Sequence, residues 1–327
     1  MANITITENM ILNKPKPIFS ERMKILGANI YKNKERYLLV LPGYLWYIIF
    51  AWIPLYGLTL AFRTFLAREG LWGSPWVGFV NFERVFADAA FFQSIATTLL
   101  INAGRLIFVF PVPIILALMI NEVRLKRTKR VMQSIFTFPH FLSWVIVGSI
   151  MINLLGNTGL VNNFVYAIFG TEPIRFMGTP AYFRPLVYFT DIWKSAGWSA
   201  IIYMAAISGI DSEQYEAAEI DGTSRLQRIW YITLPGIKPT IIVLLILAVG
   251  SLMSGGFDQI FNLSNAATMR VAETIDMYIF RITFRSSIDF SFSSAVALFR
   301  SVINFIMLLA ANFVISRVSG TGLIARS

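Results

Sequence analysis

Two polar side chains lie deep in the last apolar run of this sequence. Arg300 and Asn304 are one helical turn apart, so both would lie on the same face of a helix. A charge in the core of a bilayer costs about 2.5–3.5 kcal/mol on insertion scales, and such residues usually serve a function. We expect this face to line a water-filled path. An ion pair with a neighbouring helix or a partner chain is the alternative.

A second group of candidate path residues lies in two earlier apolar runs. Asp191 and Lys194 are three residues apart and could form an ion pair on one helix, and Trp193 and Trp198 would offer flat surfaces on which sugar rings stack. Arg105 adds a guanidinium in another run. The alternative for the tryptophans is a place in the aromatic belt at the membrane interface, and an arginine can extend its head toward that interface.

Several kinds of chemistry find no residues here. The sequence has no cysteine and one histidine, which excludes thiol catalysis, a cysteine metal site and a histidine-cluster metal centre. It has no Gly-Lys pair and therefore no phosphate-binding loop of the kind that holds ATP. We expect no catalytic residues, no metal site and no cofactor bound by this chain.

The candidate residues must be positioned by membrane-spanning helices. Apolar residues make up 56% of the 327 positions and charged residues only 14%, too few for a soluble domain. We predict an all-α integral membrane protein with six spans and a basic amino-terminal tail at residues 1–36. The six-span region covers 37–317 and a short tail covers 318–327. The predicted spans are 37–62, 92–120, 139–155, 185–207, 240–260 and 290–316. Between the second and third spans, we expect residues 131–138 to lie along the membrane surface.

The distribution of basic residues predicts the orientation. With the amino terminus in the cytoplasm, 17 Lys and Arg residues lie in cytoplasmic segments and 8 in outer loops. Cytoplasmic loops normally carry this excess, so both termini are expected inside. The net charge of +10 then reflects membrane topology, and we expect no nucleic-acid partner.

A polar stretch, Ser212–Pro239, separates the fourth and fifth predicted spans. Its pattern is helix, turn, helix: Gly222 ends the first helix and Thr223 or Ser224 caps the second. We expect Leu234-Pro235 to end the second helix, because the residue before a proline is pushed out of the α region. A charged hairpin between two spans has the shape of a docking element.

The residues of this hairpin carry a specific resemblance. Glu216-Ala217-Ala218, then Asp221-Gly222, then Leu234-Pro235 resemble, in order and spacing, the cytoplasmic "EAA" loop of permease subunits of binding-protein-dependent ABC importers. Thr223 and Trp230 depart from the commoner residues without disturbing the turn. The resemblance implies the type I importer permease fold. It also implies that these residues, with Arg225, couple the membrane helices to a separate ATPase.

The same resemblance implies the remaining partners. They are two ATP-binding subunits that carry ATP and Mg²⁺, an extracellular solute-binding protein and a second, related permease in the bacterial cell membrane. A heterodimer is favoured here, with a homodimer as the alternative.

Two apolar segments point to a class of solute. LPGYLWYIIFAWIPLYGLTLAF at 41–62 and FPHFLSW at 138–144 resemble the polysaccharide-type branch of the maltose-transporter-like carbohydrate importers. If Arg300, Lys194 and Arg105 line the path, an acidic oligosaccharide such as a pectin or alginate fragment would suit it, with a neutral oligosaccharide as the alternative.

Two other classes of protein are alternatives to an importer permease. An ion-coupled secondary transporter normally needs intramembrane carboxylates, and Asp191 is the only acid well inside a predicted span. A membrane enzyme acting on lipid-linked sugars would need a convergent catalytic constellation, for which this sequence offers little.

Overall fold

The computed structural model describes residues 19–285 and 288–319. The elements described are helices joined by turns and short loops, with one isolated bridge between Arg63 and Trp76, so the predicted all-α fold is confirmed there. The chain divides into two compact units, Met1–Thr59 and Leu60–Ser327. Residues 1–18 of the predicted basic tail and 320–327 of the predicted carboxyl-terminal tail lie outside the described residues.

The first unit carries the first predicted span. Helix α2 (Phe19–Lys32) is followed by α3 (Lys34–Tyr47), the π-helical turn η1 (Ile48–Trp52) and the 3-10 helix η2 (Ile53–Phe62), which runs on into the second unit. The expected span at 37–62 is therefore helical along its whole length.

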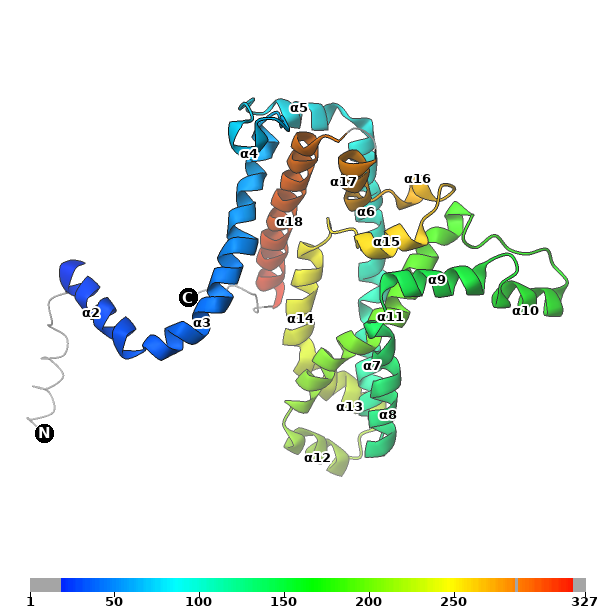
Figure 1. Ribbon diagram of the computed structural model, residues 1–327. Coiled ribbons are helices and arrows are strands. Elements are labelled where there is room, and N and C mark those ends of the chain that lie inside the picture. Colours follow the sequence, from blue (N-terminus) through cyan, green and yellow to red (C-terminus); the bar gives the residue numbers. More distant parts are fainter. Residues whose placement is uncertain (1–18, 286–287, 320–327) are drawn as a thin grey trace, which may run out of the picture. The chain divides into compact units, whose positions relative to one another are not determined.

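The second unit holds the remaining elements, shown in Figure 1. Its first part comprises α4 (Gly70–Gly73), α5 (Val80–Ala87), α6 (Ala89–Gly104), η3 (Arg105–Val109), α7 (Pro111–Asn121), α8 (Lys126–Thr137), η4 (Phe138–Phe141), α9 (Trp144–Leu155), α10 (Leu160–Phe169) and α11 (Pro180–Ser208). Its second part comprises α12 (Ser212–Ile220), α13 (Arg225–Arg228), η5 (Ile229–Thr233), α14 (Leu234–Gly250), α15 (Phe257–Leu263), α16 (Met269–Ala272), α17 (Ile275–Phe284) and α18 (Phe290–Ser319).

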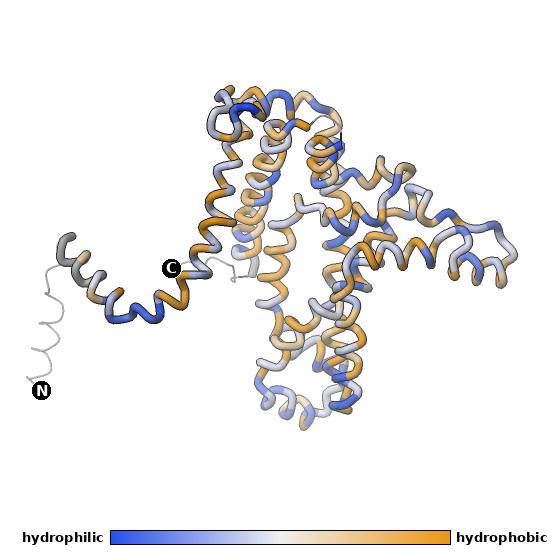
Figure 2. Tube along the Cα trace, in the orientation of Figure 1, coloured by the Kyte–Doolittle hydropathy of each residue, from blue (hydrophilic) through white to orange (hydrophobic). Residues whose placement is uncertain are grey.

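Five stretches among the described residues are long and apolar enough to cross a membrane. They are Lys34–Phe62, Ala89–Asn121, Trp144–Phe169, Arg225–Gly250 and Phe290–Arg317. The fourth predicted span, 185–207, lies within α11, a 29-residue helix that carries Asp191 and Lys194 and is not among the five. Figure 2 shows apolar residues along α14 and α18 and hydrophilic residues at the turn around α12.

Three prolines interrupt these long helices without ending them. A π-helical turn ends two residues before Pro54, Pro111 and Pro235 in turn. Proline lacks an N–H donor and its ring crowds the carbonyl one turn back. A wider turn just before it relieves that crowding, and the helix continues.

One segment differs from the sequence-based expectation. The helix expected at 240–260 ends at Gly250, and α15 begins only after Gly256, whose φ of +69° is left-handed. Residues 131–137 belong to α8, which contacts α7 and α11 and runs alongside them in Figure 1; their place along the membrane surface stays a prediction.

Close helix packing fixes the scaffold of the second unit. Helix α11 packs against α7 through a core that includes Ala117, Ala200 and Tyr203, and α14 packs against α18 around Ile246. At Gly197 of α11, an added Cβ would lie 2.0 Å from the carbonyl oxygen of Phe136. Only glycine lets α11 and the end of α8 approach this closely.

Candidate functional site

The polar hairpin forms the turn that its sequence predicts. Asp211 caps α12, accepting a hydrogen bond from the Glu213 amide at 3.0 Å. Gly222 has φ +71°, in the left-handed region. Thr223 then donates twice to the carbonyl oxygen of Ala218, from its amide at 3.1 Å and from its hydroxyl at 2.7 Å. The expected glycine-terminated turn is confirmed.

The second arm begins as expected and ends differently. Ser224 and Gln227 form a reciprocal capping box at the start of α13, which confirms Ser224 as the cap. The prediction that Leu234-Pro235 ends this arm is wrong. The π-helical turn η5 just before Pro235 accommodates the proline, and the helix continues from Arg225 to Gly250. The second arm of the hairpin is thus the first part of a 26-residue helix.

The two arms are tied together and present an exposed surface. The hydroxyls of Tyr215 and Thr233 lie 2.9 Å apart, and Ala218 is buried between the arms. Glu216, Ala217, Asp221 and Arg225 are exposed. Four large apolar side chains are also exposed, by 66–86%: Ile220, Leu226, Trp230 and Tyr231. Such a patch beside charged residues is typical of a protein interaction site.

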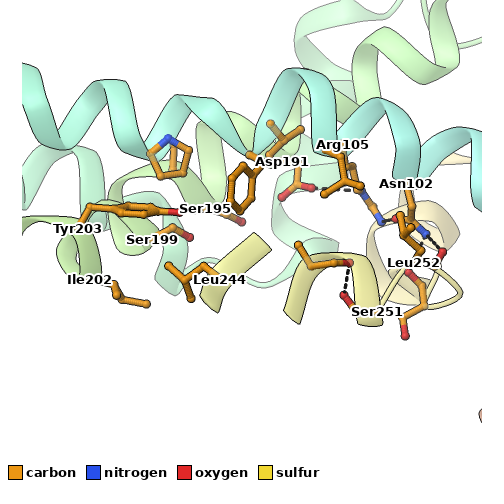
Figure 3. Close-up of a pocket in the computed structure, with 17 residues that line it drawn as sticks. Asn102, Arg105, Asp191, Ser195, Ser199, Ile202, Tyr203, Leu244, Ser251 and Leu252 are labelled. Atoms are coloured by element: carbon orange, nitrogen blue, oxygen red, sulfur yellow. Dashed lines mark hydrogen bonds and ion pairs between the residues drawn. The ribbon is translucent and has the colours of Figure 1, made fainter. Parts of the chain in front are cut away.

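A cavity of about 390 Å³ lies between α6, α7, α11 and α14. Figure 3 shows Ser195, Ser199 and Tyr203 of α11 along one side, with Leu244 and Ser251 opposite. The hydroxyls can hydrogen-bond a hydroxylated solute, and the apolar walls between them can pack against its ring faces. Ser195, Ser199 and Tyr203 were not among the residues expected to line the path, although their spacing of four places them on one helix face.

Arg105 and Asp191 lie together at one end of this cavity (Figure 3). Arg105 Nε lies 3.2 Å from Asp191 Oδ2, and the guanidinium also donates to Asn102, Gln259 and the carbonyl oxygen of Gly255. Asn102 in turn donates to the carbonyls of Leu252 and Ser254. The polar cluster therefore fixes the non-helical segment between α14 and α15.

Comparison with known proteins identifies the family. Residues 109–320 match the family described as "Binding-protein-dependent transport system inner membrane component". The chain belongs to this family. It is 41% identical over 292 residues to the polygalacturonan/rhamnogalacturonan transport system permease protein YteP of Bacillus subtilis, a match that covers 89% of this chain and 91% of that protein. Protein LplB of the same organism is 40% identical over 297 residues, with 90% and 93% covered.

Solved structures agree with that assignment. A chain of a bacterial ABC transporter involved in the import of the acidic polysaccharide alginate superposes with a TM-score of 0.82 at 36% identity, covering 90% of this permease and 99% of that chain. The same transporter in complex with a periplasmic protein bound to an alginate pentasaccharide gives a TM-score of 0.81. The permease is a multi-pass component of the cell membrane and has the type I importer permease fold.

The two residues expected on the last helix of the permease have partners within the chain. Arg300 forms an ion pair with Asp276 of α17. Asn304 Oδ1 accepts from the Met253 amide at 3.0 Å, and Asp276 Oδ2 accepts from the Gly255 amide at 2.7 Å. Neither Arg300 nor Asn304 lines the cavity between α6, α7, α11 and α14. Asn304 thus binds directly the same non-helical segment that Arg105 binds, and Arg300 pairs with the carboxylate of Asp276 that binds it.

Lys194, Trp193 and Trp198 do not line this cavity either. The expected ion pair between Asp191 and Lys194 is wrong: Asp191 pairs with Arg105, and Lys194 donates to the carbonyl oxygen of His140 at 2.7 Å. Trp198 stacks on the His140 ring with centroids 4.5 Å apart. Trp193 lines a different, apolar groove beside α9 and α10.

Two polar partners of these residues escaped the sequence analysis. Gln259 lies inside the expected fifth span, and Asp276 lies in an expected loop. Their signal is the small-residue run that ends in Gly255-Gly256, which marks a break in the helix where unpaired backbone groups need polar partners.

Proposed function

We propose that this permease is one membrane subunit of an ATP-driven importer that takes up an acidic oligosaccharide. The observation that carries the choice of solute is its similarity, at 36–41% identity over about nine-tenths of the chain, to permeases whose names specify polygalacturonan, rhamnogalacturonan and alginate. These polymers consist of or contain uronate sugars. A solute-binding protein outside the cell would deliver the oligosaccharide, as in the alginate complex.

The hairpin is the proposed site of coupling to the ATPase. Two ATP-binding subunits would each hold ATP and Mg²⁺, and this chain would perform no hydrolysis itself. Closure of the ATPase pair would move the hairpin. The unbroken helix from Arg225 to Gly250 would carry that movement toward the cavity. The exposed side chains Ile220, Leu226, Trp230 and Tyr231 support this role, because a docking surface needs apolar contacts of this size.

A neutral oligosaccharide is the second candidate, and one observation favours it. Arg105 and Asp191 are the two charged residues that line the cavity, and they pair with each other at 3.2 Å. This half of the path therefore presents no unpaired cation to a carboxylate. An acidic solute would then be recognised by its binding protein and by a second permease. For this reason we favour a heterodimer.

The proposed topology has six spans with both termini in the cytoplasm. Five helices meet the length and hydropathy of a span, and α11, with 29 residues packed against α7, supplies the sixth. Cysteine accessibility on the two faces of intact cells tests this assignment. Labelling of a cysteine introduced at the exposed position 217 from outside the cell would contradict it.

Reconstituted transport tests the proposed function. The permease would be co-purified with its partners, placed in liposomes and supplied with binding protein loaded with a galacturonate oligosaccharide or with a neutral glucan oligosaccharide of equal length. ATP hydrolysis stimulated by the acidic sugar alone supports the first candidate, and stimulation by the neutral sugar alone supports the second. Uptake without ATP, driven by an ion gradient, would instead indicate a secondary transporter.

A further inference from the structure

One basic cluster lies outside both the hairpin and the cavity. Helix α8 begins with Lys126, Arg127, Lys129 and Arg130, and it contains no acidic residue. Lys126, Arg127 and Arg130 are exposed, and the structure records no ion pair for any of the four with the residues it describes. Four cations within five residues repel one another and favour an anionic partner.

One member of the cluster, Lys129, lines a groove of about 680 Å³ between α8 and α11. From α8 and η4 the groove is lined by Lys129, Gln133, Ser134, Thr137, Phe138 and Phe141, and from α11 by Ile201, Met204, Ala205 and Ser208. Its character therefore changes along its length, from a cation through hydroxyl and amide groups to aromatic and aliphatic side chains. Lys126, Arg130, Gln133 and Thr137 repeat at helical spacing, so they follow one face of α8.

The charged end of the groove is level with the ends of neighbouring helices. Lys129 Nζ donates to Asn121 Oδ1, at the last residue of α7, at 3.3 Å. Ser208, the last residue of α11, lines the same groove. Helix α7 ends an apolar span, so these residues lie where a span meets the polar headgroup region. Val131 and Ile135 of α8 and Phe138 of η4 are exposed by 51–66%, as suits contact with acyl chains.

From this arrangement we infer that the groove between α8 and α11 is a binding site for an anionic phospholipid. The phosphate lies between Lys126, Lys129 and Arg130, the ester groups lie near Gln133 and Thr137, and an acyl chain follows Phe138 and Phe141. Arg130 to Phe141 spans about 16 Å at helical rise, which accommodates a headgroup, its ester region and the first part of an acyl chain. Basic residues between membrane helices on the cytoplasmic side bind lipid headgroups in this way.

The change from a charged to an apolar lining along the groove favours a lipid over a soluble anion or a protein. A free phosphate would gain contacts with the cations alone, because most of the groove beyond Ser134 is apolar. A protein partner would have to place both acidic and apolar groups at membrane depth. An anionic lipid matches the change from charged to apolar along the whole groove.

Native mass spectrometry of the intact importer complex tests the site. The complex is titrated in detergent with phosphatidylglycerol, phosphatidylcholine or inorganic phosphate. The test variant is Lys126→Gln/Arg130→Gln. The control is Lys238→Gln/Arg317→Gln, which removes two exposed cations from other helices. At about tenfold for each 1.4 kcal/mol, and with the usual contribution of a basic residue near an anionic surface, the test variant should bind phosphatidylglycerol about 30-fold more weakly. The control should stay within twofold of the wild type.

A second variant separates the groove from its charge. Ala205→Trp fills the groove without altering the basic cluster, and we expect it to lose bound phosphatidylglycerol while the complex stays assembled. Equal binding of phosphatidylcholine would overturn the inference, and so would full displacement of the lipid by inorganic phosphate. A photoreactive residue at position 134 should crosslink to lipid. Crosslinking to another subunit would show that protein covers the groove and would also overturn the inference.

Discussion

The turn at Gly222 allows a sharp test of coupling. Its φ is +71°, and a Cβ added there would meet no atom within 4 Å. An added Cβ therefore creates no clash, and the cost of substitution comes first from the backbone conformation. A left-handed conformation costs an ordinary L-residue about 1–2 kcal/mol, and a β-branched residue is among the least tolerant of it. We take about 2 kcal/mol as the strain of Gly222→Val.

That strain is comparable with the interactions that close the turn. Each of the two hydrogen bonds from Thr223 to Ala218 contributes about 1 kcal/mol, and the Ser224 cap contributes a similar amount. A cost of 2 kcal/mol reduces the ratio of closed to open turn about 30-fold. We expect the two arms to lose their fixed angle and ATP hydrolysis to lose its dependence on loaded binding protein.

The assay compares Gly222→Val with Gly222→Asn in the reconstituted complex. Asparagine adopts the left-handed region at much lower cost, so it should retain most of the sugar-stimulated ATPase activity. Recovery of the ATPase in pull-downs checks that both variants assemble. Normal stimulation in the valine variant, or equal loss in both variants, would refute the argument from backbone conformation.

Three further substitutions test the packing and the polar clusters. Arg105→Ala leaves a mostly buried carboxylate unpaired, so we expect the free energy of unfolding to fall by about 3 kcal/mol in a detergent denaturation series. Gly197→Ala places a Cβ 2.0 Å from the Phe136 carbonyl oxygen and should cost about 1–3 kcal/mol in the same series, whereas Gly209→Ala at the C-cap of the same helix, with its nearest contact at 3.4 Å, should cost little. Arg300→Ala should lower the melting temperature of the purified complex, and Arg300→Lys should recover part of the loss. An unchanged melting temperature with lost uptake would instead place Arg300 on the solute path.

Local signals in the sequence predicted the local structure well. Gly222 and Ser224 occupy the expected places because a left-handed turn and a helix cap depend on residue type and near neighbours. The helical character of the apolar runs follows from their length. The prediction that a helix ends at Pro235 was wrong, because a proline ends a helix only where the preceding turn cannot widen. The residue before the proline does not determine whether that turn can widen.

Long-range partners could not be read from the sequence. Asp191 pairs with Arg105 on another helix and leaves its near neighbour Lys194 to a backbone carbonyl. Intrahelical spacing shows which side chains can meet, but the packing of η3 and α15 against α11 decides which do. The cavity likewise depends on how α7, α11 and α14 diverge, and its hydroxyls resemble many others in apolar helices.

The polar residues inside the membrane region have a common structural role. Asn102 and Arg105 bind the backbone at Leu252, Ser254 and Gly255 from one side. From the other side, Asn304 binds the Met253 amide and Asp276 binds the Gly255 amide. The break between α14 and α15 leaves backbone groups without helical partners, and each such group would cost several kcal/mol if it were unpaired away from water.

This arrangement connects the hairpin to the cavity through one continuous helix. A single helix of 26 residues, about 39 Å long, begins in the second arm of the hairpin and ends at the non-helical segment between α14 and α15. Because the segment is held by side chains of α6, α17 and α18, a displacement of the hairpin along this helix must either move those three helices together or break the bonds that hold the segment. The first course changes the shape of the cavity and leaves the buried polar groups paired. It therefore requires less energy, and we expect the importer to move these helices as one body.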